Sequence, residues 1–435
     1  MDTPNLHNNN AANNNNNPWS PSLAHFDLSH SVPLLASRGL KLATKWAAEQ
    51  LMGIDLNQVT NDPTDLSTSS PPPLPPTPSP LSPLSPAVAF AKSLLDLGEY
   101  VRAAAVLSID GRAKPGLPDD GVFVRAYSQF LAGEKRKEED IVELTTASPL
   151  ERTKVQNSHL PQLRSELAES HAEGTLDSFG LYIYGVVLKE LLQQQSPEEG
   201  GAGGGEETNE EEEENKLLEK ARDVLVESIL EYEFNWSAWL DLASICISFP
   251  SIHSTVETLL SSLTSSYMYH LFLAHVFLEQ QQNDSALQVI DKVAVLFPES
   301  NYLKAQTALA FYNRRDFDKA QTHFLDLCSR DPYRVEQMDV FSNILYVKES
   351  KAELSSLAHA ASKVDKYRPE VCCIIGNYYS LKGVHGKAVQ VRGGGEEEER
   401  GGRAEREREE EAKKKKPFVS EEALCFFFFS LFFFS

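Results

Sequence analysis

The sequence predicts an all-α fold, a superhelix built from repeated helix pairs. Four windows, which begin at Tyr267, Asn301, Val335 and Pro369, align at an offset of 34 residues without a gap. Small and bulky residues recur in matching columns of these windows. A period of 34 residues is typical of the helix-turn-helix unit of tetratricopeptide-repeat (TPR) proteins. We therefore expect a TPR superhelix, an α-solenoid whose core is shared between stacked units. The complete units are predicted at 267–300, 301–334 and 335–368.

Three columns of the repeat support this register because each has a packing role. The eighth position, where the two helices of a unit approach most closely, is small in every window. The eleventh position is bulky and is expected to fill the groove between units. The twentieth position is small except at Leu354, so we expect looser packing in the third unit. The predicted packing residues are Ala274, Phe277, Ala286, Ala308, Phe311, Ala320, Gly376, Tyr379 and Ala388.

Weaker helical patterns extend the repeat region towards the N-terminus. Residues 87–195 are predicted to form TPR-like helices, and residues 216–266 irregular ones. Within them, Gly185 and Leu225 occupy the columns in which the two helices of one unit meet. An amphipathic helix is also predicted over residues 36–55, because apolar residues recur there near helical spacing.

The remaining segments have compositions that do not build a packed core. Residues 1–35, rich in Asn and Pro, and the Gly/Glu insertion at 196–215 are expected to be disordered. Residues 56–86 are predicted to form an extended, Pro-rich linker. An incomplete repeat at 369–390 is followed by a low-complexity tail at 391–435. The change of composition there suggests the hypothesis that the tail is translated intron sequence.

Charge and cysteine content exclude several classes of function. The formal net charge is −22 and no basic cluster lies outside the tail, so nucleic acid is not an expected partner. The five cysteines form no C-x-x-C pair, and their odd number offers no disulfide framework, which favours an intracellular compartment. The strongly apolar run at 425–435 is shorter than the roughly 20 residues of a membrane-spanning helix. We expect a soluble protein without a membrane partner.

No catalytic, metal-binding or cofactor-binding site is predicted. Cys372 and Cys373 fall on a predicted helix, where packing is the favoured interpretation. His270 and His275 do not share a helical face, and no Glu is placed as in the H-E-x-x-H zinc motif. The glycines at 200–205 follow no predicted strand and open no apolar helix, so they do not indicate a phosphate-binding loop. The expected function is therefore binding, with no cofactor and no enzymatic activity.

A peptide-binding groove is predicted along the concave face of the superhelix. Asparagine amides both donate to and accept from an extended peptide backbone, and tyrosines add contact area at low entropic cost. The acidic members of the set favour a basic peptide. The alternative, that these polar residues only keep the groove soluble, stays open for each of them. The candidate groove residues are Tyr302, Tyr312, Asn313, Glu336, Asp339, Asn343, Tyr346 and Asn377.

Ser/Thr-Pro dipeptides in the Pro-rich linker are candidate targets of a proline-directed kinase. The candidate phosphosites are Thr77, Ser79, Ser82 and Ser85. A plain Pro-rich linker without modification is the favoured interpretation, and phosphorylation is the alternative.

Several stretches that lie outside the shared repeat columns match one known family. They are RGLKLATKWAAEQLMGI at 38–54, NWSAWLDLASIC at 235–246, YLKAQTALAFYNRRDFDKAQTHF at 302–324, the stretch at 331–370, and CCIIGNYYSLKG at 372–383. These stretches resemble subunit eight of the anaphase-promoting complex, the cell-division-cycle protein twenty-three family of TPR proteins. The resemblance covers roughly residues 37–389, and it ends inside a repeat.

The resemblance implies a non-catalytic scaffold subunit of a cell-cycle-regulated ubiquitin ligase that controls mitotic progression and exit, in the nucleus and cytoplasm. It implies sister TPR subunits and an activator protein as partners, and a homodimer formed through the N-terminal repeats at 87–195. The alternative is a co-chaperone adaptor that clamps the C-terminal carboxylate of a chaperone. That class needs Lys or Arg in the groove, where this chain has Asn, Tyr and acidic residues. An enzyme with appended TPR units would need a further globular domain.

Overall fold

The computed structural model describes residues 19–55, 85–109, 111–144, 155–195, 207–249 and 253–392. The candidate phosphosites Thr77, Ser79 and Ser82 lie outside the described residues, as does most of the predicted low-complexity tail. The chain divides into two compact units, Met1–Asp331 and Pro332–Ser435, and each is described here by itself.

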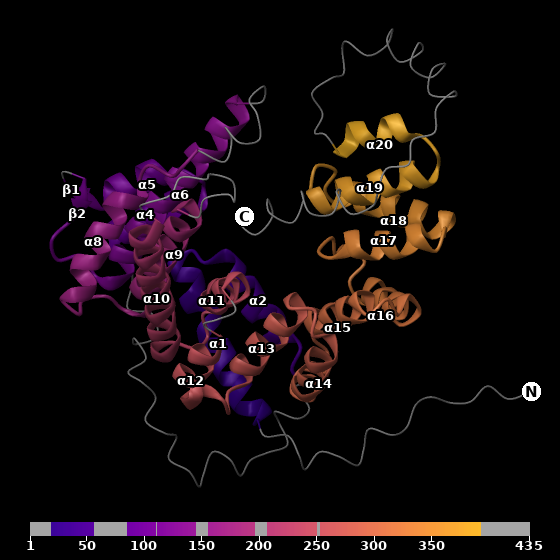
Figure 1. Ribbon diagram of the computed structural model, residues 1–435, viewed down its shortest axis with the longest axis horizontal. Coiled ribbons are helices and arrows are strands. Elements are labelled where there is room, and N and C mark those ends of the chain that lie inside the picture. Colours follow the sequence, from indigo (N-terminus) through magenta and orange to yellow (C-terminus); the bar gives the residue numbers. More distant parts are fainter. Residues whose placement is uncertain are drawn as a thin grey trace, which may run out of the picture. The chain divides into compact units, whose positions relative to one another are not determined.

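The described structure is almost entirely helical, and sequential helices pack against each other as pairs (Figure 1). The first unit contains α1 (Pro21–Arg38), α2 (Lys41–Met52), α4 (Pro86–Asp96), α5 (Tyr100–Val106), α6 (Asp119–Glu143), α8 (Leu160–Ala172), α9 (Ser178–Gln195), α10 (Glu207–Glu231), α11 (Trp236–Ser248), α12 (His253–Leu259), the 3-10 helix η2 (Ser261–Leu263), α13 (Tyr267–Glu279), α14 (Asn283–Ala294), α15 (Asn301–Asn313) and α16 (Phe317–Arg330). The second unit contains α17 (Met338–Val347), α18 (Lys351–Val364), α19 (Pro369–Leu381) and α20 (His385–Arg392). The strands β1 (Ser108–Ile109) and β2 (Arg112–Ala113) form a short antiparallel hairpin. The predicted all-α fold is confirmed.

Serine caps explain why helices begin at the start of the predicted windows. The Ser266 hydroxyl accepts a hydrogen bond from the backbone nitrogen of Met268, and α13 begins one residue after this serine. Ser300 caps α15 in the same way. Such side-chain acceptors satisfy backbone donors that the first turn of a helix leaves unpaired. In the third window the helix begins three residues late, at Met338, because Gln337 has a left-handed φ of 63°.

The predicted packing columns lie inside the helix pairs. The small residues at the closest approach, Ala274, Ala286, Ala308, Ala320, Gly376 and Ala388, are all buried. The bulky residues Phe277, Phe311 and Tyr379 are half-buried. The ring of Phe311 stacks on that of His323 with centroids 5.3 Å apart, so helix α15 meets α16 through this column.

The upstream repeat also has its predicted close approach. A Cβ atom added at Gly185 would lie 2.5 Å from Leu225 Cδ2, so glycine allows the close approach of α9 and α10 at this point. Below 3 Å the neighbouring side chain would have to move. The column assignment in this weaker repeat therefore matches the packing, although residues 207–214 were expected to lie in a loop.

The N-terminal region differs from its predicted organisation. Residues 21–35 were expected to be disordered, but they belong to α1, which Ser20 caps and which buries Ala24, Leu28 and Leu35. The helix predicted over 36–55 is divided, because Gly39 has φ of 80° and ends α1 before α2 begins. These three apolar residues share one helical face, and their burial against neighbouring helices stabilises α1. The prediction was wrong because residues 1–35 were treated as one segment of uniform composition, although the Asn tract ends before α1 begins.

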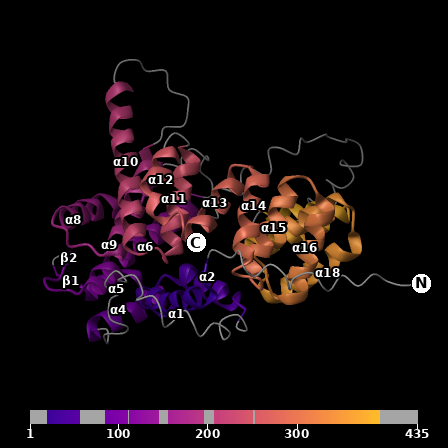
Figure 2. The ribbon, with the colours of Figure 1, turned by 90° about the horizontal axis from the view of Figure 1, so that it is seen from below.

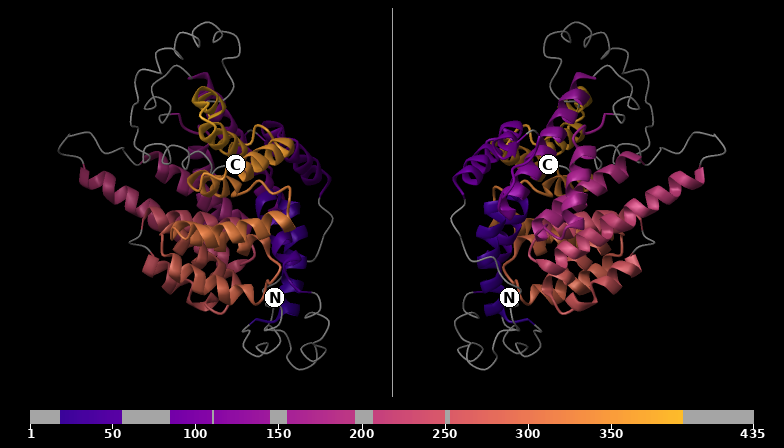
Figure 3. Two further views of the ribbon diagram at one scale, coloured as in Figure 1. Left: turned by 90° about the vertical axis from the view of Figure 1, so that its right-hand side faces the viewer. Right: turned by 90° about the vertical axis from the view of Figure 1, so that its left-hand side faces the viewer.

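Two predicted loop boundaries also differ from those in the structure. Helix α10 begins at Glu207, inside the predicted disordered insertion, and its N-terminal part extends past the neighbouring helices (Figure 3). Glutamate has a good helix propensity, and negative charge near a helix N-terminus is favourable. Helix α4 begins at Pro86, which was assigned to the linker, because Ser85 caps it and proline is well accommodated in a first turn. Within the described residues, no helix is long and apolar enough to cross a membrane.

Candidate functional site: the inner face of the repeats

The N-terminal segment, defined as residues 19–54, packs across helices that are far apart in the sequence. The Trp19 indole nitrogen donates to the backbone oxygen of Ser265 at 2.6 Å, next to α13. The Arg38 guanidinium pairs with Asp177 at 2.9 Å and lies 4.8 Å from the ring centroid of Phe179 on α9. The segment therefore contacts the repeat helices at both of its ends and at the corner between α1 and α2.

An aromatic cluster fixes α2 to α11 and α15. The indole rings of Trp46 and Trp236 stack with centroids 4.5 Å apart and an interplanar angle of 11°. Tyr302 stands edge-on to both, at 6.2 and 6.3 Å. Burial, the largest cause, raises the pKa of the Tyr302 phenol well above its usual value. This candidate groove residue packs against the N-terminal segment of its own chain.

Hydrogen bonds continue the same contact beyond the aromatic rings. The Ser300 hydroxyl donates to Gln50 Oε1 at 2.9 Å in a buried position. The backbone nitrogen of Glu299 donates to the Gly53 oxygen at 3.1 Å. A Cβ atom at Gly53 would lie within 3.0 Å of the Ser300 backbone, so the two segments approach closely. The end of α2 is thus joined to the turn that begins α15.

Two further groove candidates lie at the C-terminal end of α15. Asn313 Nδ2 donates to Asn283 Oδ1 at 3.2 Å, and Asn283 Nδ2 donates to the backbone oxygen of Gln281 at 3.1 Å. The ring of Tyr312 lies 5.9 Å from that of Phe317. Both candidates are half-buried, and they belong to the first unit together with Tyr302.

The five remaining groove candidates belong to the second unit, where an asparagine ladder joins α17 to α19. Asn377 Nδ2 donates to Asn343 Oδ1 at 2.7 Å and to the Ser342 hydroxyl at 2.8 Å. These asparagines are 34 residues apart, so the repeat register brings them together. Asn377 is buried and Asn343 is half-buried. Asn377 therefore positions Asn343.

The acidic candidates of this unit are Glu336 and Asp339, and Glu336 pairs with both Arg334 and Arg368. Burial raises the pKa of Asp339, and the nearby charge of Glu370 adds to that rise. Arg368 lies 3.6 Å from Glu336 and 3.1 Å from Glu370. Arg368 was not among the predicted groove residues, although it directly precedes Pro369, where a repeat begins. Tyr346, about two turns after Asp339, is exposed.

Cys246, His275 and Cys372 lie where burial disfavours the charged forms of their side chains. Burial raises the pKa of the Cys246 thiol to about 12 and lowers that of His275 to about 4. Burial also raises the pKa of Cys372, with Asp365 adding to it. Thiols are reactive when their pKa is lowered, so these environments oppose activation. Among the described residues, no group of three or more His, Cys, Asp or Glu could hold a metal ion.

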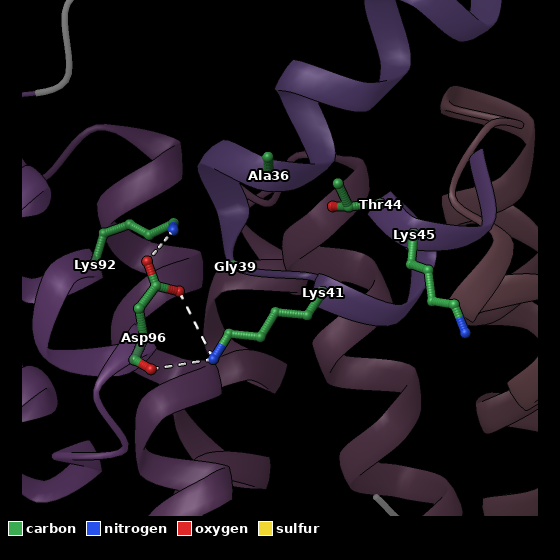
Figure 4. A pocket seen from close by; sticks show the side chains of 7 residues that line it. All are labelled: Ala36, Gly39, Lys41, Thr44, Lys45, Lys92 and Asp96. Atoms are coloured by element: carbon green, nitrogen blue, oxygen red, sulfur yellow. Dashed lines mark hydrogen bonds and ion pairs between the residues drawn. The ribbon is translucent and has the colours of Figure 1, made fainter. Parts of the chain in front are cut away.

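A small cavity lies at the corner between α1, α2 and α4 (Figure 4). Asp96 pairs with Lys92 and lies 3.9 Å from the Lys41 ammonium, which also donates to the Asp96 backbone oxygen at 3.2 Å. Lys45 and Thr44 complete the lining on α2. The ion pairs tie the start of α2 to the end of α4.

A buried carboxyl group lies on α9. Glu190 is 2% exposed, and its Oε2 lies 3.9 Å from Lys137 Nζ. Its Oε1 has no hydrogen-bond partner in the described part of the chain. Burial raises its pKa to about 7, with Glu134 and Asp241 adding to the rise and Lys189 and Lys137 opposing it. The folded state therefore binds this proton more tightly than the unfolded state does.

Glu190→Gln is expected to stabilise the first unit at pH 8 and to leave its stability near pH 5 almost unchanged. The stability contributed by the protonated carboxyl is complete below its ordinary pKa of 4.5 and is lost as the pH rises through about 7. A shift of this size corresponds to roughly 3 kcal/mol at high pH. Urea unfolding at both pH values measures it, with exposed Glu138→Gln as the control. An equal effect at both pH values would contradict the assignment.

Comparisons with known proteins identify the family to which the chain is similar. A family model described as "Anaphase promoting complex subunit 8 / Cdc23" matches residues 24–199 and 211–308. "Anaphase-promoting complex subunit 8" of Arabidopsis thaliana is 38% identical over 388 residues, covering 83% of this chain and 60% of that protein. Its Dictyostelium discoideum counterpart is 36% identical, covering 83% of this chain and 63% of that protein. "Cell division cycle protein 23 homolog" of Homo sapiens is 37% identical, covering 75% and 47%.

The chain spans about half to three fifths of the length of these relatives. The family model includes α1, which confirms that the N-terminal helices belong to the shared fold. It covers more than half of the chain. This protein is a member of the anaphase-promoting complex subunit 8/Cdc23 family.

Proposed function

We propose that this chain acts as a non-catalytic TPR scaffold of the anaphase-promoting complex, a cell-cycle-regulated ubiquitin ligase that controls mitotic progression and exit. Membership of the subunit 8/Cdc23 family is the observation that carries the proposal. The stacked helix pairs support it, because such pairs offer an extended inner surface for protein partners. The proposed partners are sister TPR subunits, an activator protein, and a second copy of the chain bound through residues 87–195. The proposed location is the nucleus and cytoplasm.

The proposed peptide contacts are concentrated in the second unit. Asn343, held by Asn377, is half-buried, and the acidic residues Glu336 and Asp339 belong to the same unit. This combination suits a peptide that supplies both a backbone to hydrogen-bond and a basic side chain. Tyr302 takes a packing role in this proposal, since α2 covers it.

Affinity purification of the full chain from dividing cells, followed by mass spectrometry, tests the scaffold function. Other subunits of the ligase are expected to co-purify with it. Recovery of chaperones without ligase subunits would instead support the co-chaperone adaptor and overturn the proposal. The two outcomes are distinguished by the identity of the co-purified proteins.

Asn343→Ala and Asn377→Ala are expected to weaken binding of a groove peptide by about tenfold each, the scale of one lost hydrogen bond. The first variant removes the presented amide, and the second removes the group that positions it. Fluorescence anisotropy with peptides tiled across the co-purified subunits measures the affinity. The exposed residue Ser356, on α18, supplies the control variant Ser356→Ala. Unchanged affinity in both asparagine variants would remove these residues from the groove.

A further inference from the structure

The repeat that begins with α11 has a short second helix, as does the α4–α5 pair. Helix α10 is 25 residues long, whereas α12 has only seven residues and is followed by the 3-10 helix η2. Figure 2 shows the short α12 beside the much longer α10. A helix this short covers only about 10 Å of its neighbour, at 1.5 Å per residue. Among the described residues, Leu230 of α10 is left 46% exposed beside α12.

The uncovered surface forms a groove with a distinct chemistry. A cavity of about 320 Å³ lies between α10 and α12. Its lining residues are Asp223, Val226, Glu227, Leu230, Glu231 and Leu259. Two leucines, Leu230 and Leu259, are 46% and 40% exposed on opposite sides of it. Exposed leucines are common singly, but a pair facing one cavity indicates a site for another apolar side chain.

Carboxylates line one side of this groove at helical spacing. Asp223, Glu227 and Glu231 follow one another at intervals of four residues on one face of α10, about 6 Å apart. Two of them have polar partners outside the groove lining: Asp223 pairs with Arg222 at 2.8 Å, and Glu227 lies 3.1 Å from His171 Nε2. None of the described residues that line the groove has a basic side chain.

The third carboxylate, Glu231, has acidic neighbours in Glu227 and Asp177. Burial raises the pKa of Glu231, and the neighbouring charge of Glu227 adds to the rise. A raised pKa means that the ionised form would gain from an incoming cation. The groove therefore combines an apolar centre with an acidic edge.

We propose that the groove between α10 and α12 docks a basic amphipathic helix of a partner protein. A leucine-sized side chain enters between Leu230 and Leu259, and lysines or arginines four residues apart lie against the acidic edge of α10. The rise of an α-helix gives such cations the same spacing, about 6 Å, as the carboxylates that they meet. Apolar anchors at helical spacing are how helices bind in grooves. This site is separate from the asparagine ladder, and it stands whether or not the ligase assignment holds.

A synthetic 16-residue helix of leucine and lysine, with lysines at intervals of four, is the probe. Its binding to the full chain is measured by fluorescence anisotropy at low and physiological salt. We expect Glu227→Lys with Glu231→Lys to weaken binding at least tenfold. Replacing the peptide's leucines with alanine is expected to weaken it similarly, and replacing its lysines with glutamate to abolish it. Binding that is insensitive to the leucines would overturn the apolar part of the site.

A matched charge reversal separates the groove from general attraction to an acidic protein. Glu138→Lys with Glu143→Lys changes the net charge equally but lies on exposed positions of α6. If both double variants lose the same affinity, the proposed site is wrong. Hydrogen exchange of the complex supplies an independent readout. Protection confined to residues 223–231 and 255–263 is expected, and protection elsewhere alone would also overturn the site. Thermal unfolding checks that both variants are folded.

Discussion

Replacing Trp46 with alanine is expected to lower the free energy of unfolding of the first unit by about 3–5 kcal/mol. The Trp46 side chain is 6% exposed and stacks on Trp236, with Tyr302 edge-on to both rings. The substitution removes a large apolar surface and leaves a cavity between α2, α11 and α15, and the aromatic pairing adds to the loss. Urea unfolding followed by far-ultraviolet circular dichroism measures the change. Hydrogen exchange of residues 41–52 locates it.

The matched control is Leu42→Ala, on the same helix. Leu42 is 62% exposed, so its truncation is expected to change stability by less than about 0.5 kcal/mol. The two substitutions differ in helix propensity by only a few tenths of a kcal/mol, so the much larger difference expected between them reports the contact with α11 and α15. Equal destabilisation by the two variants would mean that α2 contributes only as a helix and not as a packed element of the unit.

Arg125→Ala is expected to cost about 3–5 kcal/mol, the scale found when one member of a buried ion pair is removed. Arg125 is 3% exposed. Its guanidinium donates to Glu166 at 2.8 Å, to the Ser108 hydroxyl at 2.9 Å and to the Gly111 oxygen at 2.7 Å. One side chain thus joins α6 to α8 and to the β1–β2 hairpin. Its loss leaves the Glu166 carboxylate without this partner in a half-buried position.

Arg136→Ala is the control, because it removes the same charge from α6 without removing a buried contact. Arg136 also lies on α6, but it is 62% exposed in its contacts with Glu139 and Asp140. Exposed ion pairs contribute at most about 1 kcal/mol. Thermal and urea unfolding of both variants should separate them clearly. If the two substitutions destabilise the protein equally, the three hydrogen bonds of Arg125 do not have the role assigned to them.

The repeat register was the part of the fold most accessible from the sequence. Its columns are set by local helix packing, so spacing alone identified Ala308 and Ala320 as contacts between α15 and α16. The helices α13, α15 and α19 begin at their predicted residues. The start of α17 was less accessible, since it depends on the backbone conformation of a single residue, Gln337.

The docking of the N-terminal segment could not be predicted in the same way. Several of its contacts join residues more than 130 positions apart, as in Arg38 with Asp177 and Ser300 with Gln50. No period in the sequence relates such partners. For the same reason Tyr302 was assigned to an open groove, because the sequence gives no sign that Trp46 covers its ring. Tertiary contacts of this kind follow from the folded arrangement of the whole unit.

The candidate site was predictable as a set of residue types but not as a network. Asn343 and Asn377 were both identified from their column, and the repeat spacing brought them into contact. The salt bridges of Arg368 were not predicted, because they depend on how the turn before α19 approaches the start of α17. The groove beside α12 was likewise hidden, since it results from the shortness of that helix.

The N-terminal segment changes how the first unit should respond to force. A solenoid whose repeats contact only their neighbours behaves as a spring, because each interface can open by itself. Residues 19–54 contact residues in or next to α9, α11, α13 and α15, so one segment joins repeats that are not adjacent. Extension of the first unit would then require several interfaces to break together. Single-molecule pulling on this unit should show one large unfolding step. Repeats that contact only their neighbours would show a series of small steps.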